Sequence, residues 1–174
     1  MTRDGTLEFK QMPSPVGKLR LVASSKGLAA ILWENDRPGR VPLGLMAEGA
    51  DNAVLREAER QLAGYFAGAL QAFDLPLDFR GTDFQRQVWS ALLDIPFGQT
   101  RSYGEIAYSI GRPTASRAVG AANGRNPISI VAPCHRVIGH NGGLTGFAGG
   151  IEAKRHLLEL ERKAISSIPA GRAA

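Results

Sequence analysis

The spacing of apolar residues changes near residue 80, and this change limits the fold more than any other feature of the chain. Upstream, segments 6–12, 18–25 and 28–34 are rich in strand-forming residues and are separated by turn sequences containing Pro or Gly. Downstream, apolar residues recur at helical spacing. A chain of 174 residues can hold one ordinary domain or two small ones. We therefore expect an α+β protein with an N-terminal α/β domain at 1–80, a mainly helical domain at 81–162 and a loosely ordered tail at 163–174.

The N-terminal half is predicted to be a scaffold. Residues 39–49 form a loop rich in Pro and Gly, and a strand is expected at 73–79. Between them, residues 52–67 have apolar side chains at helical spacing, namely Leu55, Ala58, Leu62, Tyr65 and Phe66. The chain has no cysteine or histidine before residue 134, so this half offers no obvious site for a soft metal ion and no obvious catalytic group.

The C-terminal half contains a helix-turn-helix pattern. Ser102 and Glu105 form a capping box that opens a helix ending at residue 110. The sequence Gly-Arg-Pro at 111–113 breaks it, and a second helix is expected at 114–124. Small residues surround Arg117 in this second helix, which lets its backbone approach another helix or a nucleic-acid groove closely. A single arginine projecting from a bare helix favours the groove.

The positive charge of the chain is unevenly distributed. The net charge is +5, and the segment from Arg101 to Arg136 holds five arginines and one acidic residue. Arginine suits fixed contacts with phosphate and stacking on bases better than lysine does. This segment is therefore predicted to face a nucleic acid.

Cys134 is the only cysteine, so any role it has depends on the thiol rather than on an intramolecular disulfide. His135 follows it, and histidine is the side chain best suited to accept a proton near neutral pH. Pro133 precedes it and makes the approach stiff. This pattern favours a nucleophile over a cysteine that is merely buried, although free cysteines are often buried.

The N-terminus carries no apolar stretch, and no apolar run approaches the roughly 20 residues that cross a bilayer. With no disulfide and no secretory signal, the expected location is the cytoplasm, at the nucleoid when the protein is on DNA. No membrane contact is expected.

Together these residues resemble a known family. The sequence Pro133-Cys134-His135-Arg136-Val137-Ile138 is similar to the active-site signature of the O6-alkylguanine-DNA alkyltransferases, also called methylated-DNA–protein-cysteine methyltransferases. The similarity extends in order and spacing over residues 82–162, through Ser-Tyr-Gly at 102–104, Arg-Ala-Val-Gly at 117–120, Asn-Pro-Ile at 126–128 and Thr-Gly-Phe-Ala-Gly-Gly at 145–150. It implies an N-terminal domain with a ribonuclease-H-like sheet and helix, followed by a domain containing the helix-turn-helix.

The resemblance also implies a reaction. Family members flip the damaged guanine out of the duplex and pass its O6-alkyl group to a cysteine that is never regenerated, so Cys134 would be the acceptor. His135 would take the thiol proton through a water, and Glu161 would orient the imidazole. Tyr103 would donate to N3 of the leaving guanine. Spacing alone does not choose Glu161 over Glu159 or Glu152.

The resemblance assigns binding residues as well. Carbonyls of Cys134 and Val137 and the amide of Ala148 would contact the base, with Arg136 and Phe147 also in the pocket. Phe147 replaces the tyrosine that many members carry and lacks its hydroxyl. Arg117 would fill the space left by the flipped base, while the second helix lies in the minor groove. Asn126 would be the hinge to the active-site segment, and the DNA-contacting set would be Ser116, Arg117, Ala118, Ala121, Ala122, Arg125 and Asn126.

The implied partner is duplex DNA containing O6-alkylguanine, bound by a monomer without a metal or another cofactor. O4-alkylthymine as a second substrate and cooperative loading on DNA are left open. One alternative is a non-enzymatic relative that flags alkylated DNA, although such proteins lack the acceptor cysteine. Another is a helix-turn-helix regulator, although the second helix has few side chains that read base edges. A thiol hydrolase is a weaker alternative.

Overall fold

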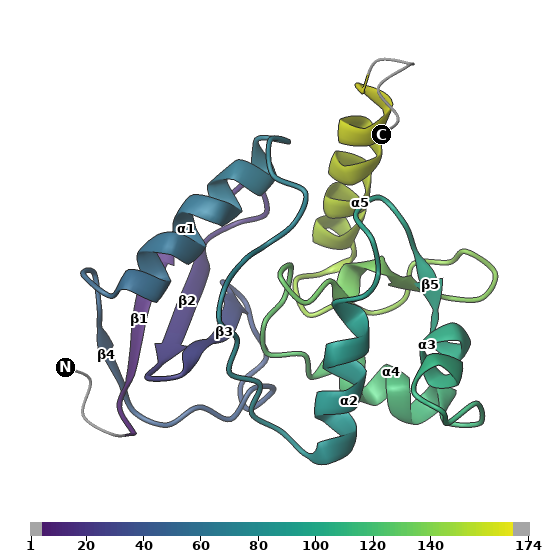
Figure 1. Cartoon of the computed structure of the whole chain (residues 1–174), viewed down its shortest axis with the longest axis horizontal. Helices are drawn as coiled ribbons and strands as arrows, with labels where there is room; N and C mark the ends of the chain where they lie inside the picture. Colours follow the sequence, from purple (N-terminus) through teal and green to yellow (C-terminus); the bar gives the residue numbers. More distant parts are fainter. Residues whose placement is uncertain (1–4, 169–174) are drawn as a thin grey trace.

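The first half of the chain forms a four-stranded sheet with one helix on it (Figure 1). The computed structural model of the chain describes residues 5–168. The strand order is β3-β2-β1-β4, with β2 antiparallel to both β1 and β3, and β4 parallel to β1. The elements of this half are β1 (Leu7–Met12), β2 (Leu19–Ser24), β3 (Gly27–Trp33), β4 (Met46–Glu48) and α1 (Ala53–Phe66).

Helix α1 packs against the sheet through the apolar stripe expected from the sequence. Asn52 caps the helix, because its side-chain oxygen accepts hydrogen bonds from the first-turn amides of Val54 and Leu55. Leu55 and Leu62 are fully buried with strand residues, and each such burial contributes about 2 kcal/mol. Tyr65, in the last turn, lies at the end of α1 that faces the second half of the chain.

Two details of this half differ from the sequence-based expectation. The loop predicted at 39–49 ends in the short strand β4, which pairs with β1. The strand predicted at 73–79 is reduced to a single bridge between Leu77 and Leu28. Pro76 has no amide hydrogen to donate, and the backbone hydrogen bonds between this segment and the start of β3 are those of the Pro76 carbonyl and the Asp78 amide.

The second half is mainly helical and contains the expected helix-turn-helix. Thr82 caps α2 in a capping box with Gln85, and Ser102 caps α3 with Glu105. Helix α4 begins at Ser116, two residues later than expected, without a side-chain cap. The elements are α2 (Asp83–Leu92), β5 (Arg101–Ser102), α3 (Tyr103–Ser109), α4 (Ser116–Gly124), the 3-10 turn η1 (Cys134–Arg136), β6 (Val137–Ile138) and α5 (Ile151–Ser166).

Helix α5 is longer than the sequence suggested. It runs to Ser166, so the first residues of the predicted tail are helical, and residues 169–174 lie outside the described part of the chain. Between residues 5 and 168, no helix has the length and hydropathy needed to cross a membrane.

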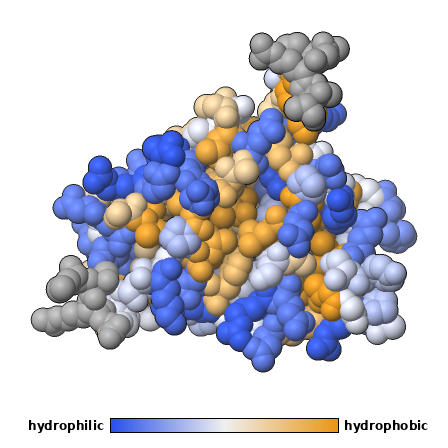
Figure 2. Space-filling view, in the orientation of Figure 1, coloured by the Kyte–Doolittle hydropathy of each residue, from blue (hydrophilic) through white to orange (hydrophobic). Residues whose placement is uncertain are grey.

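The outer edge of β3 joins the two halves. The Ile31 amide donates to the Pro127 carbonyl at 2.8 Å, and Ile31 forms a parallel bridge with Ile128. Ile128, Ile130 and Val131 share one buried cluster with the sheet. On the face shown in Figure 2, hydrophobic residues accordingly gather in the middle of the molecule, between more hydrophilic flanks. The segment leading to Cys134 is thus held by the N-terminal sheet.

Candidate active site

Cys134 opens the short turn η1 and is almost completely buried. Its amide donates to the Ala132 carbonyl, and Ile130, four residues upstream, has a φ of 75°. A positive φ is unusual for a β-branched residue, so the turn before the cysteine holds strained backbone. Burial raises the pKa of the Cys134 thiol, against the opposing effects of Asn126, Arg40, Lys154 and Ser129. The thiol therefore needs a base to ionise near neutral pH.

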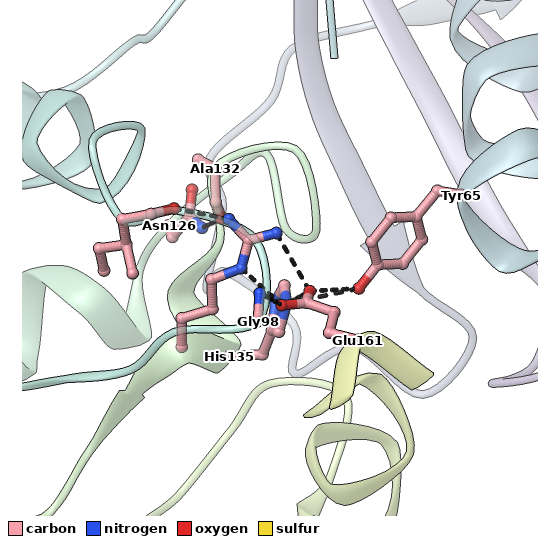
Figure 3. A network of polar contacts seen from close by, with 8 residues as sticks. Tyr65, Gly98, Asn126, Ala132, His135 and Glu161 are labelled. Carbon is pink, nitrogen blue, oxygen red and sulfur yellow. Dashed lines mark hydrogen bonds and ion pairs between the residues drawn. The ribbon is translucent and has the colours of Figure 1, made fainter. Parts of the chain in front are cut away.

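The residues after the cysteine enter a buried polar network centred on Glu161 of α5 (Figure 3). Nε2 of His135 lies 2.6 Å from Oε2 of Glu161. Arg136 donates from Nε to Oε1 at 2.8 Å and from Nη2 to Oε2 at 3.1 Å. The Gly98 amide donates to Oε1, and the Tyr65 hydroxyl donates to Oε2 at 2.6 Å. One carboxylate thus accepts from side chains or backbone of both domains.

These contacts decide the protonation states. Burial raises the pKa of Glu161, but the hydrogen bonds from His135 and Arg136 and the charge of Arg136 outweigh it and lower the pKa to about 2. Burial lowers the pKa of His135 and outweighs the opposing effect of Glu161. We assign the neutral imidazole its proton on Nε2, facing Glu161. Nδ1 is buried and has no hydrogen-bond partner among the described residues, so its lone pair can accept a proton.

Several predicted pocket residues lie close to the cysteine. Tyr103 and Phe147 pack against the buried cluster that contains Cys134 and Val137. The Tyr103 hydroxyl is 2.5 Å from the Thr145 hydroxyl, which links α3 to the Gly-rich loop. The Tyr103 ring lies beside Gly120 of α4, and a Cβ added at Gly120 would be 3.7 Å from the ring. Ala148, also predicted for the pocket, is half-buried in the same loop.

Lys154 modifies the expected pocket. Its fully buried ammonium donates to the Val137 carbonyl at 2.6 Å, the carbonyl predicted to bind the base. A carbonyl oxygen has two lone pairs, so one remains for another donor. Burial lowers the pKa of Lys154, and the nearby Cys134 opposes that shift.

Arg136, predicted to line the substrate pocket, points toward Glu161 in this structure. Its side chain is buried, makes two hydrogen bonds to Glu161, and donates from Nη1 to the Ile95 carbonyl at 2.7 Å. A guanidinium so deep in the protein needs a counterion, and the Glu161 carboxylate provides it.

The predicted DNA-contacting residues divide into two groups. Ser116 is half-buried, and the others on the outer side of α4 or just after it are exposed, namely Arg117, Ala118, Ala121 and Arg125. Ala122 instead faces inward and is buried beside Trp89, whose indole donates to the Ala122 carbonyl. Helical periodicity thus turns Ala122 toward α2, away from the exposed side of α4.

Asn126 is also internal and is fully buried in this structure. Its side chain donates to the Ala132 carbonyl at 2.8 Å and accepts from the Ile128 amide at 3.1 Å. These bonds connect the end of α4 to the segment before Cys134, which is the geometry expected of the predicted hinge.

Sequence reasoning missed three buried polar side chains. Tyr65 belongs to the apolar stripe of residues 52–67, and nothing in its spacing distinguishes it from a core aromatic. Arg40, in a loop, donates to the Gly124 and Asn126 carbonyls and pairs with Asp36. Lys154 could have been noticed, because it lies on the buried side of α5 with Leu157.

Between residues 5 and 168, no group of three or more His, Cys, Asp and Glu side chains is placed to hold a metal ion.

The fold and the site define a class of protein in which a helix-turn-helix domain carries a buried cysteine beside a histidine–glutamate pair. Matches to family models assign the chain to one family within this class. The model described as "6-O-methylguanine DNA methyltransferase, ribonuclease-like domain" matches residues 9–79, and the one for the "DNA binding domain" of the same family matches residues 83–163.

Individual relatives support the same family assignment. A methylated-DNA–protein-cysteine methyltransferase of Methanosarcina acetivorans is 51% identical over 149 residues, covering 85% of this chain and 94% of the relative. One of Mycobacterium tuberculosis is 51% identical over 161 residues, covering 90% and 93%. The crystal structure of M. tuberculosis OGT in complex with DNA matches with a TM-score of 0.80 at 49% identity, covering 91% of this chain and 94% of that one. The chain therefore belongs to the methylated-DNA–protein-cysteine methyltransferase family.

Proposed function

We propose that this protein repairs DNA by transferring the alkyl group of O6-alkylguanine to Cys134, once per molecule and irreversibly. The observation that carries the proposal is the geometry of the histidine–glutamate pair beside the cysteine. Glu161 holds the Nε2 proton of a neutral His135, and the free Nδ1 belongs to the residue adjacent to the thiol. This arrangement supplies the base that a buried thiol with a raised pKa requires.

The transfer is a displacement at carbon. The thiol proton passes through a bridging water to Nδ1 of His135, and the sulfur attacks the alkyl carbon. An S–C bond forms as the C–O6 bond breaks, and the electron pair of that bond enters the guanine ring. Tyr103 donates a proton to N3 of the departing guanine, and the proton gained by His135 balances the one that Tyr103 gives up. The products are guanine and S-alkylcysteine.

Base flipping gives the pocket access to the damaged base. Arg117 projects from an α4 surface that is otherwise covered by small residues such as Ala118 and Ala121. We propose that α4 enters the minor groove and that Arg117 takes the place of the extruded base. Unstacking a base costs a few kcal/mol, which contacts to the DNA backbone offset.

Backbone groups define the base pocket in this proposal. The Cys134 carbonyl and the remaining lone pair of the Val137 carbonyl accept from the exocyclic amine, and the Ala148 amide donates to O6. Phe147 offers a ring but no hydroxyl. The protein acts as a monomer on duplex DNA, with the reactive domain beginning near residue 81.

Intact-protein mass tests the proposal. After mixing with a duplex containing O6-methylguanine, we expect one added methyl group per chain, located on Cys134. Cys134→Ala should show no gain in mass while still binding the duplex, and a duplex with O4-methylthymine tests the second substrate. An unchanged mass in wild-type protein with a verified free thiol, together with retained binding, would instead favour a protein that flags damage.

Arg117→Ala separates flipping from chemistry. We expect repair of the duplex to slow by about 10- to 100-fold, corresponding to a few kcal/mol of lost flipping energy. Reaction with free O6-benzylguanine, which needs no flipping, should stay within about twofold of wild type. Arg155→Ala, on the exposed side of α5, is the matched control. Equal losses on both substrates would show that Arg117 is not the flipping residue.

A further inference from the structure

Tyr65 brings the N-terminal domain into the buried network. Its hydroxyl donates to Oε2 of Glu161 at 2.6 Å and lies 3.5 Å from Nε2 of His135 (Figure 3). It reaches them from the last turn of α1, while Glu161 belongs to α5 and His135 to η1. The three side chains are almost fully buried, so water does not screen these contacts.

The Tyr65 ring is held by aromatic neighbours. Phe66 and Phe97 meet it edge to face, with ring centroids 5.5 Å and 6.1 Å away, and Phe73 packs at 5.5 Å. Packing of this kind fixes the ring without help from the hydroxyl. Removing the hydroxyl alone would therefore leave the ring and its neighbours in place.

The hydroxyl is a permanent donor. Burial and the negative charge of Glu161 raise the pKa of Tyr65, so the phenol stays protonated across the physiological range. Oε2 of Glu161 consequently accepts from Tyr65, from His135 and from Nη2 of Arg136 at once. Each additional donor withdraws electron density from the oxygen that holds the histidine proton, and so weakens its hold on that proton.

We propose that Tyr65 is a positioning residue that acts through Glu161, fixing Oε2 opposite His135 and limiting the basicity of the imidazole. The activity readout of this inference rests on the proposed alkyl transfer. Tyr65 itself touches neither the sulfur nor the base.

The direction of the effect follows from the groups that face His135. These are Glu161 and Lys154 from α5, Arg136 from η1, and Tyr65 from α1. Tyr65→Phe changes only the last. With one competing donor gone, Glu161 holds the imidazolium more strongly, and the pKa of His135 rises. Since His135 must be neutral to accept the thiol proton, the acid limb of the rate profile should move to higher pH.

The test is the single-turnover rate of transfer from free O6-benzylguanine, measured from about pH 5 to about pH 9. For Tyr65→Phe we expect the acid limb to shift upward by about half a unit to one unit, which makes transfer about 3- to 10-fold slower on that limb. The alkaline plateau should stay within about threefold of wild type. Tyr108→Phe, which removes a hydroxyl from an exposed tyrosine of α3, should reproduce the wild-type profile.

A structural role alone would give a different result. If the hydroxyl only stabilised the fold, Tyr65→Phe would lower the rate by one factor at every pH, and this outcome would overturn the inference. A second variant keeps the hydroxyl and reverses the sign. Placing 3-fluorotyrosine at position 65 makes the phenol a stronger donor, so the acid limb should move to lower pH.

An NMR titration of the histidine side chains separates this inference from the proposed function. His140 and His156 are exposed and serve as internal references for His135. We expect a higher pKa for His135 in Tyr65→Phe, whether or not the wild-type protein transfers alkyl groups. An absence of transfer by wild type would overturn the proposed function, whereas an unchanged His135 titration in the variant would overturn only the role of Tyr65.

Discussion

The C-terminal domain supplies the sulfur, imidazole and carboxylate of the site, whereas the N-terminal domain supplies isolated polar side chains, two of them carried on largely apolar elements. Tyr65 gives a hydroxyl to Glu161, Trp33 gives its indole N–H to the Ser129 hydroxyl, and Arg40 gives a guanidinium to the end of α4. The reactive cysteine and histidine are adjacent in sequence and Glu161 lies 26 residues from His135, whereas the supports lie about 70 to 100 positions away from the residues that they contact.

The difference shows how the two domains divide the work. The reactive cysteine and histidine stand side by side and are visible as a motif, and the resemblance to a family adds Glu161 to them. A supporting hydrogen bond needs only one donor or acceptor at the correct place. A residue that otherwise packs in the core can supply that donor or acceptor. The N-terminal domain, which the sequence indicated to be a scaffold, therefore also stabilises the charge distribution of the site.

Glu161→Gln should have the largest effect on stability and on transfer, because Glu161 accepts hydrogen bonds from both domains. The variant leaves Arg136 buried without its counterion, and we expect a loss of about 3 to 5 kcal/mol in the free energy of unfolding. Transfer should slow by about 100-fold, since the imidazole loses its anionic partner. Urea unfolding and single-turnover kinetics measure the two effects. Glu159→Gln, exposed on the same helix, should change neither.

The same variant gives a test by pH. The pKa of Glu161 is lowered from 4.5 to about 2 in the folded protein. Its contribution to stability is therefore complete above the unfolded pKa and is lost as the pH falls from about 4.5 to about 2. We expect wild type to lose about 3 kcal/mol across this window through Glu161, and Glu161→Gln to lack that component. Parallel acid-unfolding curves would contradict the assigned ionisation.

Arg40→Met tests the support that reaches α4. The variant removes the donor to the Asn126 and Gly124 carbonyls and leaves Asp36 without its ion-pair partner. We expect a loss of about 2 to 4 kcal/mol, because these groups are buried or partly buried. Arg37→Met, exposed in the same loop, should stay within about 0.5 kcal/mol of wild type. Equal stabilities of the two variants would show that Arg40 does not hold the domains together.

Trp33→Phe should have the smallest effect. It removes the 3.1 Å hydrogen bond to Ser129 but keeps a ring near Phe147, which Trp33 meets edge to face at 5.3 Å. We expect a cost of about 1 to 2 kcal/mol. A double-mutant cycle with Ser129→Ala should give a coupling of about 1 kcal/mol, and additive effects would remove Trp33 from the set of supports.

The sequence predicted those parts of the structure that depend on local patterns. The capping box at Ser102 and the stripe of α1 place helices nearly where the structure has them, because caps and periodicity act within a few residues. Local patterns do not show which partner a residue meets. The segment at 73–79 has strand-like composition but pairs only with the start of β3. Arg136 belongs to the motif around the cysteine, but its side chain binds a carboxylate 25 residues away.

The edge pairing of Ile31 with residues 127–128 also has a consequence for chimeras between relatives. A crossover in the linker near residue 80 would take β3 from one parent and residues 127–128, which pair with it, from the other. The chimera would then contain a mismatched pair although both parents were active. Functional recombinants should therefore inherit β3 together with residues 126–134 from one parent, whichever source provides the rest. The inherited unit in this protein is discontinuous along the gene.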